Sequence, residues 1–141
     1  MEQTNEHTRR SSNAAPAETS TAATLAICSG AWLIPGLGHI LLGRWVRGLI
    51  FAAAVLAMFI MGLAMHGKLY DLAFEEPLQL FAFIANVGVG LPYMIAEHFD
   101  LGAGLTIARS YDYGTVYLWV CGLLNFLVVI DAFDIAKGRK P

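Results

Sequence analysis

The residues best suited to binding or chemistry in this 141-residue chain lie in one glycine-rich stretch between two apolar runs. The stretch holds Pro35, Gly36, Gly38, His39, Gly43, Arg44, Trp45, Arg47 and Gly48. Pro35 ends or kinks a helix, so nearby carbonyls need new partners, and His39 is close enough to serve one. Arg44 and Arg47 share a helical face, where with Trp45 they would sit among lipid phosphates. The stretch predicts a helical hairpin turn anchored at headgroups; a specific site for an anionic lipid or small anion is the alternative.

A second group of polar residues lies inside the later apolar runs. Asn125 stands near the middle of the last run, and Asp131 and Asp134 follow on one face near its end. We expect Asn125 to hydrogen-bond to a neighbouring helix, worth about 0.6–2 kcal/mol, and both aspartates to reach interfacial water. The alternative is a proton or cation relay lined by Asn125 and Asp131. Asn86 stands with Gly88, Gly90 and Pro92, which mark a kink or close helix contact.

Several kinds of chemistry find no support in the residue pattern. Cys28 and Cys121 fall inside apolar runs, as small buried hydrophobes do, and no spacing is typical of a metal or redox motif. A net charge of −2 without a basic tract argues against nucleic-acid binding. Gly36-x-Gly38 follows no strand and is no dinucleotide fingerprint. We therefore expect no catalytic, cofactor or metal residues, and a protein that is not an enzyme.

Composition predicts an all-α integral membrane bundle. The chain is 57% hydrophobic and 14% charged, against about 25% charged in a typical soluble domain. Four apolar runs have the ~20 residues that cross a ~30 Å hydrocarbon layer, near residues 24–42, 48–65, 78–96 and 115–136. The transmembrane domain would then cover 23–136, between a disordered polar tail at 1–22 and a basic tail at 137–141.

The first run leaves two arrangements open. Pro35 leaves an arm of about ten residues, or ~15 Å, before the break, so a re-entrant hairpin is the alternative to a full span. With four spans both termini share a side, and the cytoplasmic side of a cell membrane is favoured by charge. That side would carry six basic residues: Arg9, Arg10, Lys68, Lys137, Arg139 and Lys140. The other side would carry three: Arg44, Arg47 and Arg109. Arg44 would then lie outside, too far from Asp131 to pair, whereas a re-entrant first run would change that geometry.

The glycine-rich turn resembles a motif of small bacterial membrane proteins of unknown function. The pattern is Pro35-Gly36-Leu37-Gly38-His39-x-x-Leu42-Gly43-Arg44-x-x-Arg47-Gly48. More distantly it is similar to the two-transmembrane-helix domain, whose Gly-rich turn joins membrane segments and whose closing helix carries an Asp. Ile40 and Leu41 replace that domain's aromatic pair, and the distance to Asp131 is longer. The resemblance implies an uncharacterised multi-pass membrane protein and carries no enzymatic activity.

These observations lead to an expected function. The leading hypothesis is a non-enzymatic membrane module that packs against other membrane proteins or a second copy of itself, fixed at the headgroups by Arg44, Trp45 and Arg47. Two alternatives stay open: transport of a small solute, ion or proton through Asn125 and Asp131, and binding of an anionic lipid through Arg44 and Arg47.

Overall fold

The computed structural model describes residues 20–72 and 76–139, and these form helices and turns. The helices are α2 (Thr21–Leu33), α3 (Leu37–Leu41), α4 (Trp45–Ala64), α5 (Pro77–Val87), α6 (Leu91–His98) and α7 (Tyr111–Ala136). Within the described ranges the β-structure is one isolated antiparallel bridge, between Lys68 and Ala103. The all-α expectation is confirmed. Most of the expected N-terminal tail lies outside the described residues, although helix α2 already begins at Thr21, with the Ser20 side chain accepting from the Ala23 amide at 3.3 Å.

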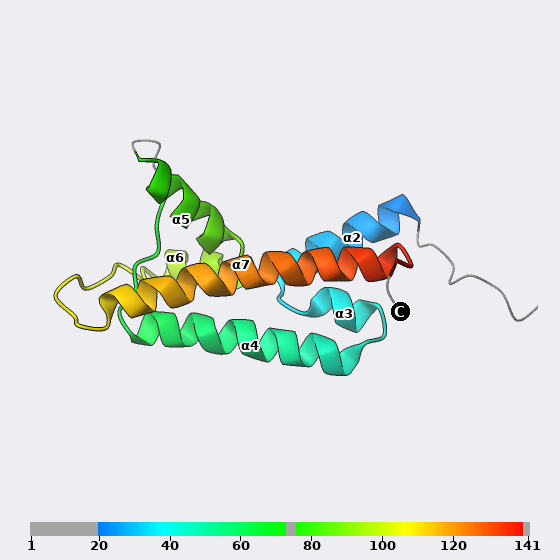
Figure 1. Cartoon of the computed structure of the whole chain (residues 1–141), viewed down its shortest axis with the longest axis horizontal. Coiled ribbons are helices and arrows are strands. Elements are labelled where there is room, and N and C mark those ends of the chain that lie inside the picture. Colours follow the sequence, from blue (N-terminus) through cyan, green and yellow to red (C-terminus); the bar gives the residue numbers. More distant parts are fainter. Residues whose placement is uncertain (1–19, 73–75, 140–141) are drawn as a thin grey trace, which may run out of the picture.

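Two long helices, α4 and α7, form the frame of the molecule. They run in opposite directions along its longest axis and pack side by side (Figure 1). Both are long and apolar enough to cross a membrane. Their shared core includes Val55, Phe59, Leu118 and Cys121, all buried. These helices correspond to the runs expected at 48–65 and 115–136, extended at their N-terminal ends by three and four residues.

The first apolar run is not one span, because the helix breaks at Pro35-Gly36. Helix α2 has 13 residues, about 20 Å at 1.5 Å per residue, which is short of a ~30 Å hydrocarbon layer. After the break α3 turns back, so that α2 and α3 begin and end at the same end of the molecule as the C-terminal part of α7 (Figure 1). The chain therefore folds here as a helical hairpin, and a continuous helix over 24–42 is not found.

The run expected at 78–96 is also broken. Helices α5 and α6 meet at an angle of 110°. The bend falls at Gly88–Gly90, where Gly90 has φ +81° and ψ −129°, and Pro92 follows in the first turn of α6. We call this bent pair the elbow. The described chain thus has two single helices that could cross a membrane, or three spans if the elbow counts as one, and four straight spans are not found.

The elbow begins and ends at the end of the molecule opposite the α2–α3 hairpin. The segment before α5 and the segment after α6 are joined by backbone hydrogen bonds, from Leu69 N to Gly102 O at 2.9 Å and from Leu105 N to His66 O at 3.2 Å. Residues 101–108 form turns around the isolated bridge at Ala103. Two interrupted helices therefore enter from opposite ends, and both pack against α7, the hairpin also against α4.

Candidate functional site

His39 and Asp131 form a buried polar pair at the hairpin end of the bundle. His39 Nε2 lies 3.0 Å from Asp131 Oδ2; the histidine side chain has no exposed surface, whereas the carboxyl group is 29% exposed. An ionised carboxylate can only accept, so Nε2 carries the proton and donates it. The edge of the Phe51 ring packs against the imidazole, with centroids 5.0 Å apart. The expectation that His39 serves a freed carbonyl is wrong, because its partner is a side chain of α7.

Local geometry explains how a residue of the turn reaches α7. Gly36 caps α3 with φ +81°, and a Cβ there would overlap the carbonyl oxygen of Gly48. A Cβ on Gly38 would stand 2.7 Å from Ala31 Cβ and 3.0 Å from Ala132 Cβ. The two glycines therefore let α3 lie directly against its neighbours, and this close approach carries His39 to Asp131.

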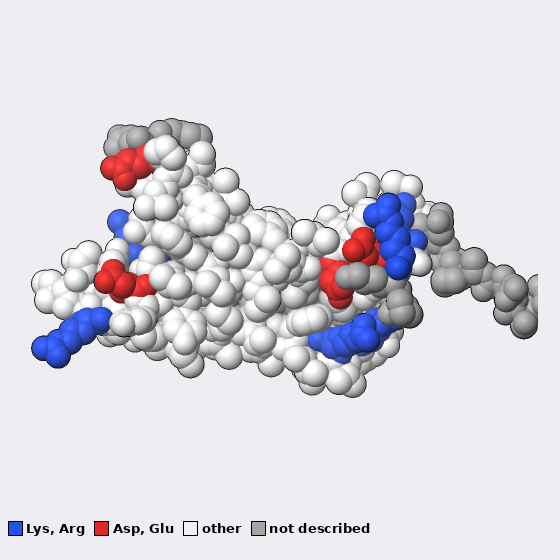
Figure 2. Space-filling view, in the orientation of Figure 1, with Lys and Arg blue, Asp and Glu red and all other residues white. Residues whose placement is uncertain are grey.

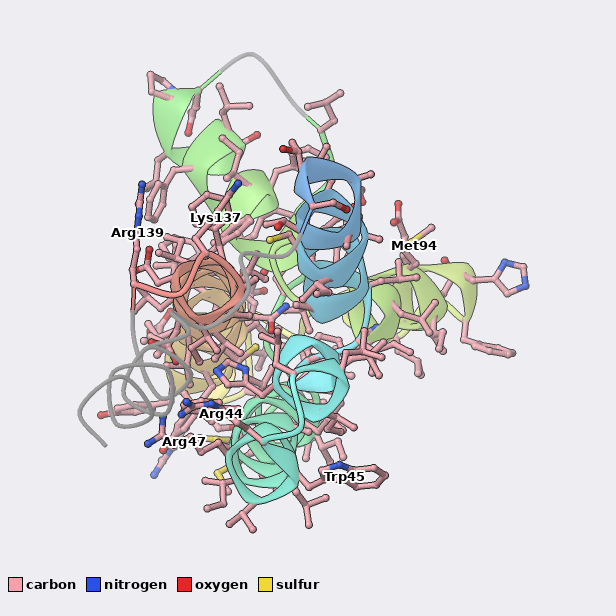
Figure 3. The ribbon with its side chains drawn as sticks, turned by 90° about the vertical axis from the view of Figure 1, so that its right-hand side faces the viewer. Arg44, Trp45, Arg47, Met94, Lys137 and Arg139 are labelled. Carbon is pink, nitrogen blue, oxygen red and sulfur yellow. The ribbon has the colours of Figure 1, made fainter. Side chains whose placement is uncertain are left out.

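Basic side chains surround this pair at the same end. Figure 2 shows acidic side chains there with basic side chains on two sides. Arg44 and Arg47 lie on one side of the first turn of α4 and Trp45 on the other, while Lys137 and Arg139 lie beyond the end of α7 (Figure 3). Arg139 also pairs with Asp134, Nη1 to Oδ1 at 3.7 Å. The expected placement of Arg44 at the end opposite Asp131 is wrong, since the hairpin returns both to one end.

Asn125 lies where the two broken helices meet. Its Nδ2 donates to Gly88 O at 2.9 Å and to Trp32 O at 3.2 Å, so one amide holds the bend of the elbow and the tip of α2. The expected hydrogen bond from Asn125 to a neighbouring helix is confirmed, and it is made twice. Asn125 is the fifteenth residue of the 26-residue helix α7, so this junction lies close to half-way along a helix that could cross a membrane.

The carbonyls at the junction need these donors. The residue four positions after Gly88 is Pro92, which has no N–H to donate. The residue four positions after Trp32 is Gly36, which lies past the break. The indole Nε1 of Trp32 in turn donates to Val87 O at 3.1 Å. Sequence reasoning missed Trp32, although an indole N–H inside an apolar run, three residues before a helix-breaking proline, is a signal that a partner is needed.

Some buried polar atoms have no partner among the described residues. They are both side-chain polar atoms of Asn86, Asn125 Oδ1, His39 Nδ1 and Trp119 Nε1. Asn86 is fully buried in the last turn of α5, two residues before the bend. In the described ranges, no group of three His, Cys, Asp or Glu side chains is placed to hold a metal ion. Asn125 and His39 therefore act as hydrogen-bonding groups of the interior, and the basic side chains of the hairpin end form a cluster of accessible charge.

The fold and these sites define an all-helical protein in which two unbroken apolar helices are long enough to span a membrane and two further apolar runs are each broken. Residues 26–141 match a family of unknown function (DUF6677), and the chain belongs to this family. No curated protein and no solved structure matches the chain.

Proposed function

We propose that this protein is a non-enzymatic membrane module whose basic end binds the headgroups of anionic lipids in the cytoplasmic leaflet. The observation that carries the proposal is the return of the α2–α3 hairpin, which gathers Arg44 and Arg47 with Lys137 and Arg139 at one end (Figure 3). The two aspartates at that end already have partners, His39 and Arg139. Arg44 and Arg47 are therefore available to bind phosphate, as guanidinium groups do with two parallel hydrogen bonds.

The two ends of the molecule differ in charge, which supports an orientation. The end opposite the hairpin carries two described basic residues against five acidic ones, namely Lys68 and Arg109 against Asp71, Glu76, Glu97, Asp100 and Asp112. Basic residues close to membrane segments favour the cytoplasmic side. The hairpin end, and with it the C-terminus, would then face the cytoplasm of a cell membrane. The resemblance to the two-transmembrane-helix domain stays a prediction, with α4 and α7 as the two spans.

Labelling of single cysteines tests this topology. In a background with Cys28 and Cys121 replaced by alanine, Val46→Cys and Arg139→Cys are expected to react with an impermeant maleimide from one side. Ile107→Cys, at a position 96% exposed near the opposite end, is expected to react only from the other side. In the four-span arrangement, in which the first run and the elbow both cross the membrane, Val46→Cys and Arg139→Cys would react from opposite sides.

Lipid binding is tested by removing the two arginines. Arg44→Ala with Arg47→Ala is expected to lower retention of anionic phospholipid by about tenfold, because each basic side chain near a headgroup contributes about 1 kcal/mol and exposure reduces that value. The measurement is native mass spectrometry of protein released from nanodiscs that contain anionic and zwitterionic lipids with the same acyl chains.

The matched control changes the net charge by the same two units at the other end. Arg109→Glu, at an exposed position that lines neither hollow of that end, is expected to leave anionic-lipid retention within twofold of wild type. Equal losses in Arg109→Glu and in the double arginine variant would show that net charge, rather than a site at the hairpin end, governs retention, and would refute the proposal.

Packing against other membrane proteins or a second copy stays part of the proposal. Helix α4 exposes Val46, Leu49 and Ile60 to more than half of their surface, so lipid or a protein helix can cover it. Transport through Asn125 and Asp131 is not proposed. Asn125 holds two carbonyls and Asp131 holds His39, and neither lines the two hollows of the elbow described below.

A further inference from the structure

The elbow encloses an apolar groove that the chain does not fill. The groove has a volume of about 400 Å³ and lies between α5, α6 and the tip of α2. Its walls include Trp32, Phe83, Val87, Tyr93 and Met94. Two of the aromatic wall residues carry a polar atom, and both atoms are already hydrogen-bonded. Trp32 Nε1 donates to Val87 O, and the Tyr93 hydroxyl donates to Tyr70 O. The groove is therefore suited to an apolar ligand group, and its volume lies in the range of small-molecule sites.

A charged hollow adjoins this groove. It has a volume of about 260 Å³ and is lined by Lys68, Asp71, Glu97 and Asp100, with Glu97 lining both spaces. No salt bridge within the described ranges joins Lys68 to these carboxylates. The Lys68 ammonium instead stands 5.1 Å from the centre of the Tyr70 ring. Burial raises the pKa of the Tyr70 hydroxyl, and the adjacent Tyr111 adds to the increase, so Tyr70 carries no charge.

The charges of the hollow select among phospholipid headgroups. One ammonium group suits a phosphate, and three carboxylates suit an organic cation that donates hydrogen bonds. Aminoethyl phosphate carries both groups a short distance apart. A choline headgroup has the positive charge but no N–H to donate, and a glycerol headgroup has no positive charge. Because the described carboxylates do not converge as metal ligands, an organic cation fits the hollow better than a metal ion.

We propose that the elbow binds one phospholipid with an aminoethyl phosphate headgroup, its acyl chain in the groove and its headgroup over Lys68 and Glu97. This site lies at the end opposite the basic hairpin, on α6 rather than α4; Met94, in its wall, projects far from Arg44 and Arg47 (Figure 3). The two sites would thus bind lipids of different charge in opposite leaflets, and each can exist without the other.

The test compares two headgroups on identical acyl chains. Purified protein is reconstituted in nanodiscs with equal amounts of ethanolamine and choline phospholipids, released, and analysed by native mass spectrometry. Wild type is expected to retain one ethanolamine lipid in preference to choline lipid. Glu97→Gln with Asp100→Asn, both at exposed positions, is expected to reduce that preference about five- to tenfold, since each exposed charge contact is worth up to about 1 kcal/mol.

A second variant tests the groove apart from the headgroup. Met94 is 54% exposed, so Met94→Trp can fill the groove without disturbing the core, and it is expected to lower retention of both lipids. Arg44→Ala with Arg47→Ala is expected to leave the ethanolamine preference unchanged, whether or not anionic lipid is lost. The proposal is overturned if wild type retains the two headgroups equally, if Glu97→Gln with Asp100→Asn has no effect, or if Met94→Cys cross-links to a second copy seated in the groove.

Discussion

Gly36→Ala is expected to destabilise the α2–α3 hairpin by about 3 kcal/mol or more. Gly36 has φ +81°, a left-handed conformation that costs a residue with a Cβ about 1–2 kcal/mol. The added methyl group would also overlap the Gly48 carbonyl oxygen and approach Ala52 N to 3.1 Å, all of it backbone that cannot rotate away. Overpacking of this kind costs about 1–3 kcal/mol. The measurement is unfolding in mixed micelles with increasing SDS, followed by circular dichroism.

Gly43 provides the matched control for this substitution. It lies in the same turn with φ +77°, but nothing stands within 4 Å of the position its Cβ would take. Gly43→Ala therefore carries the conformational cost alone, about 1–2 kcal/mol. Equal destabilisation by the two substitutions would contradict the close approach of α3 to α4. Loss of the common-side labelling of Val46→Cys and Arg139→Cys only in Gly36→Ala would show that the hairpin itself depends on this contact.

The two long helices could be predicted because their signal is local. The predicted runs at 48–65 and 115–136 are predominantly apolar over enough length to span a bilayer, and burial in lipid or protein demands a helix in either case. The breaks at Pro35 and near Pro92 could also be predicted, since a proline removes a backbone donor wherever it stands. Length and composition were sufficient for these elements.

The direction of the chain after each break could not be predicted. An apolar helix has the same composition whether it continues across a membrane or returns to the side it came from. The return of α3 depends on Gly38 packing against Ala31 and Ala132, and Ala132 is 94 residues away in the sequence. With the hairpin returning, Arg44 lies at the same end as Asp131, so a count of basic residues on the two sides depends on a fold that the sequence does not reveal.

The site residues were identified more reliably than their partners. The sequence identifies Asn125 and His39 because polar side chains in apolar runs need hydrogen bonds. The partner of Asn125 was predicted only as a neighbouring helix, and Asp131, 92 residues from His39, was assigned to interfacial water. Partner choice depends on how the helices pack, and a single sequence carries little information about packing over such separations.

Asn125→Leu is expected to destabilise the protein by about 2–4 kcal/mol, because it leaves Trp32 O and Gly88 O buried without the donor that now holds them. Leucine has the same branching and the same number of side-chain heavy atoms as asparagine but larger methyl groups, so the effect of size is measured separately by the same substitution at Asn86. The measurement is again SDS unfolding, accompanied by limited proteolysis at the junction. Proteolysis is expected to be faster near Gly88–Gly90, where the elbow loses its attachment to α7.

Asn86→Leu, on the neighbouring helix α5, is expected to have the opposite effect on stability. Asn86 is as fully buried as Asn125, yet neither polar atom of its side chain has a partner among the described residues. Replacing an unpaired buried amide with an apolar group of similar shape is expected to be neutral or stabilising. The same change therefore has opposite expected outcomes at two buried asparagines. If both substitutions destabilise equally, burial rather than hydrogen bonding explains the effect at Asn125, and the junction is held by the Trp32 indole and close packing instead.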